Sequence, residues 1–194
     1  MSNAKVISEL LERGKQSGKL STKEITDAIT SVEGIKLLDV DPGQATNRTV
    51  VTFVGEPEAV AEAAFRGVKK ASEVIDMRHH KGAHPRIGAT DVLPIIPVAG
   101  ITLEECAEIA RTLAKRIYDE LGIPTYNYEA AAQRPERRNL AVCRKGEYEG
   151  REKRISDPNE APDFGPGKYT EQAARSGATV VGARDFLIAV NFNL

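Results

Sequence analysis

The sequence predicts an α+β fold in which helices pack against a mixed β-sheet. Two observations support this prediction. First, segments rich in β-branched residues alternate with amphipathic helical segments along the chain, and turn residues separate them. Second, the 194 residues contain 41% hydrophobic and 28% charged side chains, a composition typical of one globular domain. We therefore expect a single domain with a hydrophobic core of its own.

Three helices are predicted from apolar stripes at helical spacing and from residues that favour helix ends. Gly34 and Gly122 supply the stops of the first and third helices. A further short helix is expected at residues 6–13. The expected starts of the three main helices are a capping box of Ser21 and Glu24, Pro57 at a first helical position, and a capping box of Thr102 and Glu105.

Strands are predicted wherever short apolar or β-branched runs lie between turn residues. The first two should pair antiparallel, because only a short turn beginning with residues 41–43 connects them. Pro94 and Pro97 favour an edge strand or a bulge for the third. Residues 131–177 are charged and rich in turn residues. The expected strands are residues 35–40, 48–54, 92–98, 125–128, 178–181 and 186–192.

Charge and composition exclude several function classes. The formal net charge is −1, so no overall field favours nucleic acid or an anionic membrane surface. No long apolar run predicts a membrane span, and the first fifteen residues show no secretory signal. Cys106 and Cys143 are far apart and form no Cys-x-x-Cys pair. Two free thiols in a reducing, cytoplasmic setting are therefore expected.

The candidate chemistry is centred on a loop at residues 76–91, which contains all three histidines of the chain. His79, His80 and His84 lie within six positions, between arginines and glycines. Three interpretations compete: a solvated surface loop, a metal site, and acid–base catalysis beside bound anionic groups. We favour catalysis, because histidine moves protons near neutral pH and the neighbouring cationic residues would repel a metal ion.

Three further segments have open interpretations. The turn at residues 41–48 is either ordinary turn chemistry or the place from which Asp41 supports a histidine. The run at residues 161–177 is either a flexible loop or a glycine-lined wall for a flat ligand. It lacks the context of a kinase Asp-Phe-Gly motif and the spacing of a phosphate-binding loop. The arginines 134, 137 and 138 form either a solvated face or an anchor for a carboxylate tail.

Several of these stretches together resemble the N-terminal subdomain of glutamate formiminotransferase, the folate enzyme of histidine degradation. The resemblance extends from about residue 35 to the end of the chain. Residues 80–82 and 84–86, which read His-Lys-Gly and His-Pro-Arg, lie at its centre. The matching stretches are residues 37–41, 46–50, 52–55, 75–77, 80–82, 84–86, 88–89, 91–92, 96–98, 146–149, 161–166, 177–180, 182–184 and 186–189.

The resemblance implies a ferredoxin-like α/β sandwich, with a mainly antiparallel mixed sheet and helices on one face. It also implies formimino transfer between tetrahydrofolate N5 and the amino group of glutamate, with the folate as co-substrate and no metal. The family's general acid–base histidine falls on His84, and its accompanying aspartate falls on Asp41. Arg48 and Arg86 are expected to contact carboxylates. The implied substrate-binding residues are Asn47, Arg48, His80, Arg86, Gly165, Pro166, Gly167 and Gly177.

Two departures from the family pattern matter. Family members open with a strand that ends in Pro-Asn-Phe-Ser-Glu-Gly, whereas residues 10–15 here read Leu-Leu-Glu-Arg-Gly-Lys. The family enzyme also has a second subdomain, and this chain is expected to be the first subdomain alone, over residues 1–194. We therefore expect self-association or a partner that carries the second subdomain. The alternative hypothesis is a non-catalytic module that binds folate or a partner subunit.

Overall fold

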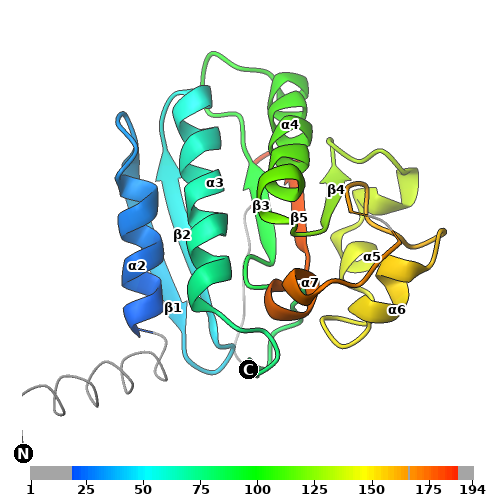
Figure 1. The fold of residues 1–194 in the computed structure, drawn as a ribbon. Helices are drawn as coiled ribbons and strands as arrows, with labels where there is room; N and C mark the ends of the chain where they lie inside the picture. Colours follow the sequence, from blue (N-terminus) through cyan, green and yellow to red (C-terminus); the bar gives the residue numbers. More distant parts are fainter. Residues whose placement is uncertain (1–18, 166, 188–194) are drawn as a thin grey trace, which may run out of the picture.

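A computed structural model of the protein describes residues 19–165 and 167–187 (Figure 1). The helix expected at residues 6–13 and most of the strand expected at 186–192 lie outside these residues. Phe186 and Leu187, at the start of that expected strand, are described and belong to no strand. No helix in the described ranges is both long and apolar enough to cross a membrane.

A helix and a hairpin open the described chain. They are α2 (Lys19–Thr30), β1 (Lys36–Gly43) and β2 (Arg48–Val54). The strands pair antiparallel as predicted, with Gly43 opposite Arg48. The turn was expected to begin at Asp41, but β1 continues through Pro42 and Gly43. Pro42 is tolerated there because β1 lies at the edge of its two-stranded sheet. The helix α2 already includes Lys19, so Ser21 lies inside it and does not cap it.

Two long helices follow the predicted pattern closely. Helix α3 (Pro57–Val74) begins at the expected proline. Helix α4 (Leu103–Leu121) has a complete capping box between Thr102 and Glu105. It ends at Gly122, whose φ of 67° lies in the left-handed region that glycine adopts without strain. These starts and stops were predictable because each depends on residues within one helical turn.

The remaining strands form a second, parallel sheet. Its members are β3 (Val92–Ile95), β4 (Thr125–Glu129) and β5 (Thr179–Ala183), in the order β3-β5-β4. The α+β class and the mixed pairing are confirmed. The expectation of mainly antiparallel pairing is wrong for the described strands, because both pairings in this sheet are parallel. Parallel pairing needs a crossover between strands, and α4 provides the one from β3 to β4.

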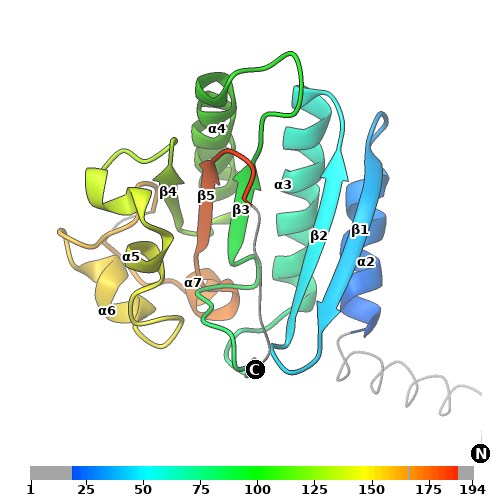
Figure 2. The same cartoon turned by 180° about the vertical axis from the view of Figure 1, so that it is seen from behind.

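Helices α2, α3 and α4 cover one face of the strands, as expected, and views from opposite sides agree on this arrangement (Figures 1 and 2). The main core is formed between α3, α4 and the parallel sheet. Its buried members include Phe65, Val68, Leu113, Ile117 and Val181. This arrangement leaves the chain between α3 and β3, which contains the histidines, free to lie at the end of the sheets.

The turn-rich region at residues 131–177 contains helical turns that were not predicted. They are η1 (Pro135–Arg138), α5 (Leu140–Arg144), α6 (Arg151–Ser156) and α7 (Glu171–Ser176). Each is too short to show apolar periodicity. Buried arginines hold these turns together. Arg151, for example, is fully buried and donates hydrogen bonds to the carbonyls of Glu147 and Lys145.

Arg137 differs from both interpretations of its arginine cluster. It is 3% exposed and forms an ion pair with Asp163 at 2.7 Å. Its guanidinium also lies 5.0 Å from the centre of the Tyr126 ring. Arg134 donates a hydrogen bond to the carbonyl of Asn159 and is therefore not a purely solvated side chain. Arg137 is therefore part of the structural core of this region, and it is not available to hold a carboxylate tail.

Candidate functional site

The histidine loop at residues 76–91 is anchored at several points along its length. The Met77 backbone N–H donates to the carbonyl of Arg175 at 2.8 Å, and the Met77 side chain is buried. Arg78 forms ion pairs with Asp76 and with Glu171 of α7. The hydrogen bonds from Arg78 lower the pKa of Asp76 to about 2. These contacts argue against the interpretation of a free, solvated surface loop.

The second half of the loop is fastened by two glycines and an aspartate. Gly88 and Gly177 form an isolated antiparallel bridge, and a Cβ on Gly88 would lie 2.2 Å from the carbonyl oxygen of Ala178. Ile87 is fully buried, and its backbone N–H donates to Asp91 Oδ1. The backbone around His84 is therefore held in place from both sides.

His84 contacts the hairpin through Arg48, the first residue of β2. Arg48 Nη1 and His84 Nε2 are 2.8 Å apart, and His84 Nδ1 lies 2.6 Å from the carbonyl oxygen of Pro85. A guanidinium only donates hydrogen bonds and a carbonyl only accepts them. These two contacts fit a neutral ring with its proton on Nδ1 and the lone pair of Nε2 facing Arg48. An unprotonated ring nitrogen in this position has the form that a general base needs.

His80 is held by the turn of the same hairpin. Its Nε2 lies 3.0 Å from the carbonyl oxygen of Asn47, while the Asn47 amide donates to the carbonyl of Lys81 at 2.7 Å. Asn47 has a φ of 47°, in the left-handed region that asparagine tolerates better than most residues. A Cβ on Gly82 would lie 2.3 Å from the carbonyl oxygen of Thr46, so the two turns pack backbone to backbone. The structure thus brings Asn47, Arg48, His80 and His84 together.

Asp41 belongs to the same hairpin as Arg48 and, among the described residues, forms no hydrogen bond with His84. It pairs with Val50 across the hairpin, two positions from the Gly43–Arg48 pair. Asp41 and Arg48 therefore occupy the same face of the hairpin. Asp41 is exposed, and among the described residues its carboxylate has no hydrogen bond or ion pair. In this structure the side chain that touches His84 is Arg48 and not Asp41.

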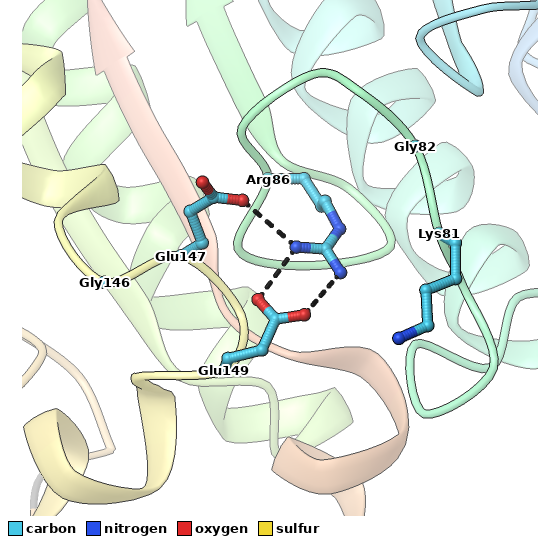
Figure 3. Close-up of a pocket in the computed structure, with 6 residues that line it drawn as sticks. All are labelled: Lys81, Gly82, Arg86, Gly146, Glu147 and Glu149. Atoms are coloured by element: carbon cyan, nitrogen blue, oxygen red, sulfur yellow. Dashed lines mark hydrogen bonds and ion pairs between the residues drawn. The ribbon is translucent and has the colours of Figure 1, made fainter.

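Arg86 of the same loop forms a second group of contacts, with two glutamates of a later turn (Figure 3). It donates two hydrogen bonds to Glu149 and one to Glu147. The bonds from Arg86 lower the pKa of Glu149 to about 2, and those from Glu149 raise the pKa of Arg86. Sequence reasoning gave no role to Glu147 or Glu149, although both belong to a stretch that carried the family resemblance.

An open pocket of about 430 Å³ lies beside this ion-paired group. The Lys81 side chain extends across it toward Glu149 (Figure 3). Its lining is polar, with cationic groups from the loop and acidic groups from the opposite turn. The lining residues are Lys81, Gly82, Arg86, Gly146, Glu147 and Glu149. A carboxylate that enters this pocket must compete with Glu149 for the Arg86 guanidinium.

Comparison with known proteins agrees with the motifs around this site. The model of the formiminotransferase domain, N-terminal subdomain, matches residues 13–184. The chain belongs to this family. It is 49% identical over 170 residues to formimidoyltransferase-cyclodeaminase of Rattus norvegicus, which covers 88% of the chain and 31% of the relative. It is 47% identical over 172 residues to glutamate formimidoyltransferase of Thermoplasma acidophilum, and this match covers 88% of the chain and 55% of the relative.

The Streptococcus pyogenes glutamate formimidoyltransferase gives a similar match, 49% identical over 164 residues, covering 84% of the chain and 54% of the relative. The chain therefore spans about a third of the bifunctional relative and about half of the two single-function relatives.

The glycine run of this formiminotransferase subdomain is divided between two places. Gly177 forms a β-bridge with Gly88 and so lies against the histidine loop. Gly165 lies against the Tyr118 ring of α4, and the Gly167 backbone N–H donates to the carbonyl of Ile155. Pro166 lies outside the described residues. Gly165 and Gly167 thus contact α4 and α6, and their expected role in folate binding stays a prediction.

Within the described part of the chain, no group of three or more histidine, cysteine, aspartate or glutamate side chains is arranged to hold a metal ion. His80 and His84 use their Nε2 atoms in contacts with the hairpin.

Proposed function

We propose that this chain is the first half of a folate-dependent glutamate formimidoyltransferase, with His84 as the acid–base group. The observation that carries the proposal is the 2.8 Å contact between Arg48 Nη1 and His84 Nε2, which places a hydrogen-bond donor against that ring nitrogen. The names of the relatives support the reaction, because both the single-function and the bifunctional enzymes are formimidoyltransferases. Tetrahydrofolate is the proposed co-substrate, and no metal is required.

In the proposed reaction the amino nitrogen of glutamate attacks the formimino carbon of 5-formiminotetrahydrofolate. A bond forms between this nitrogen and the formimino carbon, and the bond from that carbon to N5 breaks. His84 Nε2 takes the proton from the attacking amine and returns it to the departing N5. Acid–base assistance of this kind typically contributes ~10²–10⁴-fold in rate. Asp41, on the same hairpin face as Arg48, is proposed to help orient the amine.

Carboxylate binding is assigned to Arg48 and Arg86. Arg48 is exposed and, among the described residues, has no carboxylate partner. Arg86 is already paired with Glu147 and Glu149. We therefore propose Arg48 as the first contact for an incoming carboxylate, with Arg86 available only after Glu149 is displaced. Asn47 and His80 complete the proposed substrate-binding group, together with Gly165, Pro166, Gly167 and Gly177.

Transfer is proposed to require the part of the single-function relatives that this chain does not match. The support is that the chain matches just over half of the single-function relatives. The finer ferredoxin-like assignment is also proposed, with the two described sheets as parts of one larger sheet. A reducing, cytoplasmic setting is proposed because Cys106 and Cys143 are both buried and unpaired.

The test is a transfer assay with 5-formiminotetrahydrofolate and glutamate. It is run on this chain alone and on this chain mixed with the second half of the Thermoplasma acidophilum relative. In the active mixture His84→Ala should lower turnover by ~10²–10⁴-fold while folate affinity stays within a few-fold. His79→Ala is the matched control, because His79 is an exposed neighbour outside the Arg48–His84 contact. Unchanged turnover in His84→Ala would contradict the assignment.

One observation favours a second candidate function, a non-catalytic module that binds folate or a subunit. Leu38 and Val50 of the hairpin are 55% and 41% exposed, which leaves apolar surface for another polypeptide. Calorimetry with folinate, before and after addition of the second half, separates the candidates. Binding without turnover in every combination favours the module, and turnover in the mixture favours the enzyme.

A further inference from the structure

We propose that Arg48 is a positioning residue that holds His84 in the Nδ1–H tautomer until a substrate carboxylate draws the guanidinium away. The inference rests on the proposed function for its catalytic consequence, but its structural part stands on the hydrogen bonds alone. Arg48 and His84 are 36 positions apart in the sequence, and the hairpin brings them within 2.8 Å.

The two hydrogen-bond partners of the His84 ring assign its tautomer. Arg48 Nη1 donates to His84 Nε2, so Nε2 carries no proton, and the neutral ring must place its proton on Nδ1. The Pro85 carbonyl accepts that proton at 2.6 Å. A doubly protonated ring would point an N–H at the guanidinium, and the two donors could not bond. The contact with Arg48 therefore exists only with neutral His84.

His80 provides a comparison in the same loop. His80 Nε2 lies 3.0 Å from the Asn47 carbonyl oxygen, so this nitrogen must carry the proton. In their neutral forms, His80 and His84 are thus held in opposite tautomers by adjacent residues of the hairpin: the Asn47 carbonyl accepts from His80, and the Arg48 guanidinium donates to His84. The two rings lie in the same loop but have different hydrogen-bond partners. The position of the ring proton is therefore set by the partner of each ring and not by the loop as a whole.

Arg48 is placed to bind a substrate carboxylate. It is the first residue of β2, exposed, and among the residues that the structure describes it forms no ion pair. By contrast, the Arg86 guanidinium is already held by two glutamates. Arg48 is therefore the guanidinium of this site that a carboxylate can recruit without breaking an existing ion pair. When Arg48 moves to the glutamate carboxylate, the lone pair of His84 Nε2 is uncovered. Glutamate binding and exposure of the catalytic base are therefore coupled.

The tautomers are tested by two-bond ¹H–¹⁵N correlation spectra of the full chain, recorded at about pH 8, where unperturbed histidines are neutral. His84→Gln assigns the His84 signals, and His80 is the internal control. We expect His84 to show a protonated Nδ1 and a bare Nε2, and His80 to show the reverse. In Arg48→Ala the His84 signals should move to an average of both tautomers, while those of His80 stay unchanged. Arg48→Lys, which retains a cationic donor, should restore most of the single tautomer.

Two results would overturn the proposal. One is a His84 ring protonated on Nε2 in the unaltered chain. The other is an unchanged His84 tautomer in Arg48→Ala, which would assign the tautomer to the Pro85 carbonyl alone. Amide spectra of each variant confirm folding before either result is interpreted.

The kinetic consequence is measured in the mixture that restores transfer. Arg48→Ala should lower kcat by roughly ten- to a hundredfold, less than the ~10²–10⁴-fold for loss of the histidine itself. It should also raise KM for glutamate, and Arg48→Lys should recover kcat more than KM. A purely structural role would instead lower the amount of folded enzyme and leave both constants unchanged. If no mixture has activity, the proposed function fails while the tautomer result still decides the role of Arg48 in positioning His84.

Discussion

Arg86 Nη2 donates to Glu149 Oε1 at 2.7 Å, and Arg86 Nη1 donates to Glu149 Oε2 at 2.9 Å. This two-bond pair joins the histidine loop to the turn before α6, 63 positions later in the chain. The Arg86 side chain is 11% exposed while that of Glu149 is 61% exposed. The guanidinium is therefore the fixed member of the pair, and Glu149 is the member that a ligand can displace.

The ion pair predicts a specific dependence of stability on pH. The pKa of Glu149 is lowered to about 2 by Arg86, from an ordinary value of 4.5. The stabilisation is therefore complete above pH 4.5 and is lost as the pH falls toward 2. Glu149→Gln should lower the free energy of unfolding by about 0.5–1 kcal/mol at pH 7, because solvent screens this exposed carboxylate.

Urea unfolding of the chain and of Glu149→Gln between pH 7 and about pH 2 tests this prediction. The difference between the two should shrink steadily below about pH 4.5. Glu152→Gln is the control, because Glu152 is exposed and lies outside the pair. A difference that stays constant down to the lowest pH would show that Arg86 does not stabilise the Glu149 carboxylate.

The Gly88–Gly177 bridge predicts that both positions need glycine. A Cβ on Gly177 would lie 2.1 Å from the Ile87 carbonyl oxygen, and its φ is 70°. Gly177→Ala should therefore destabilise the protein by about 2–4 kcal/mol, from backbone strain and overpacking together. Gly100→Ala is the matched control, because Gly100 has a φ of 69° and nothing within 4 Å of its Cβ position.

Gly100→Ala introduces backbone strain without a steric clash, so its free energy of unfolding should fall by only about 1 kcal/mol. Thermal unfolding of both variants gives the comparison. Equal losses at the two positions would mean that the close approach of the Gly88 and Gly177 backbones is not maintained in solution.

The buried ion pair between Arg137 and Asp163 predicts a strongly non-additive double mutant. The two side chains are 3% and 5% exposed. Arg137→Met should cost about 3–5 kcal/mol, because it leaves a buried carboxylate without its cation. The double variant Arg137→Met with Asp163→Asn should be more stable than Arg137→Met alone. Additive losses in a double-mutant cycle, measured by urea unfolding, would argue against coupling between these residues.

At Asn47 the contribution of the left-handed backbone to stability can be separated from that of the side-chain hydrogen bond. Its φ is 47° and its amide donates to the Lys81 carbonyl. Asn47→Ala loses the bond and gains strain, and should cost about 1–3 kcal/mol. Asn47→Gly keeps the turn conformation and loses only the bond, so its cost should be about 1 kcal/mol. Hydrogen exchange of residues 80–84 measures the loosening of the loop, and equal effects in the two variants would contradict the role of the left-handed backbone.

Local signals in the sequence determined much of the frame. The bounds of β2 at Arg48 and Val54, the start of α3 at Pro57 and the capping box at Thr102 each depend on residues within a few positions. For this reason they were predicted correctly. The clustering of the three histidines also located the candidate loop, because that observation needs only their positions along the chain.

The partners within the site were decided by the tertiary structure. Arg48 meets His84 because the hairpin turn packs on the loop, and Arg86 meets Glu149 because the turn before α6 folds back on it. Contacts across 36 and 63 positions leave no periodicity or spacing in the sequence, since they depend on how separate elements pack. The same reason explains the unpredicted parallel sheet and the short helices of residues 135–176. Propensity and capping act within a helical turn, whereas strand pairing and buried ion pairs are fixed only when distant segments meet.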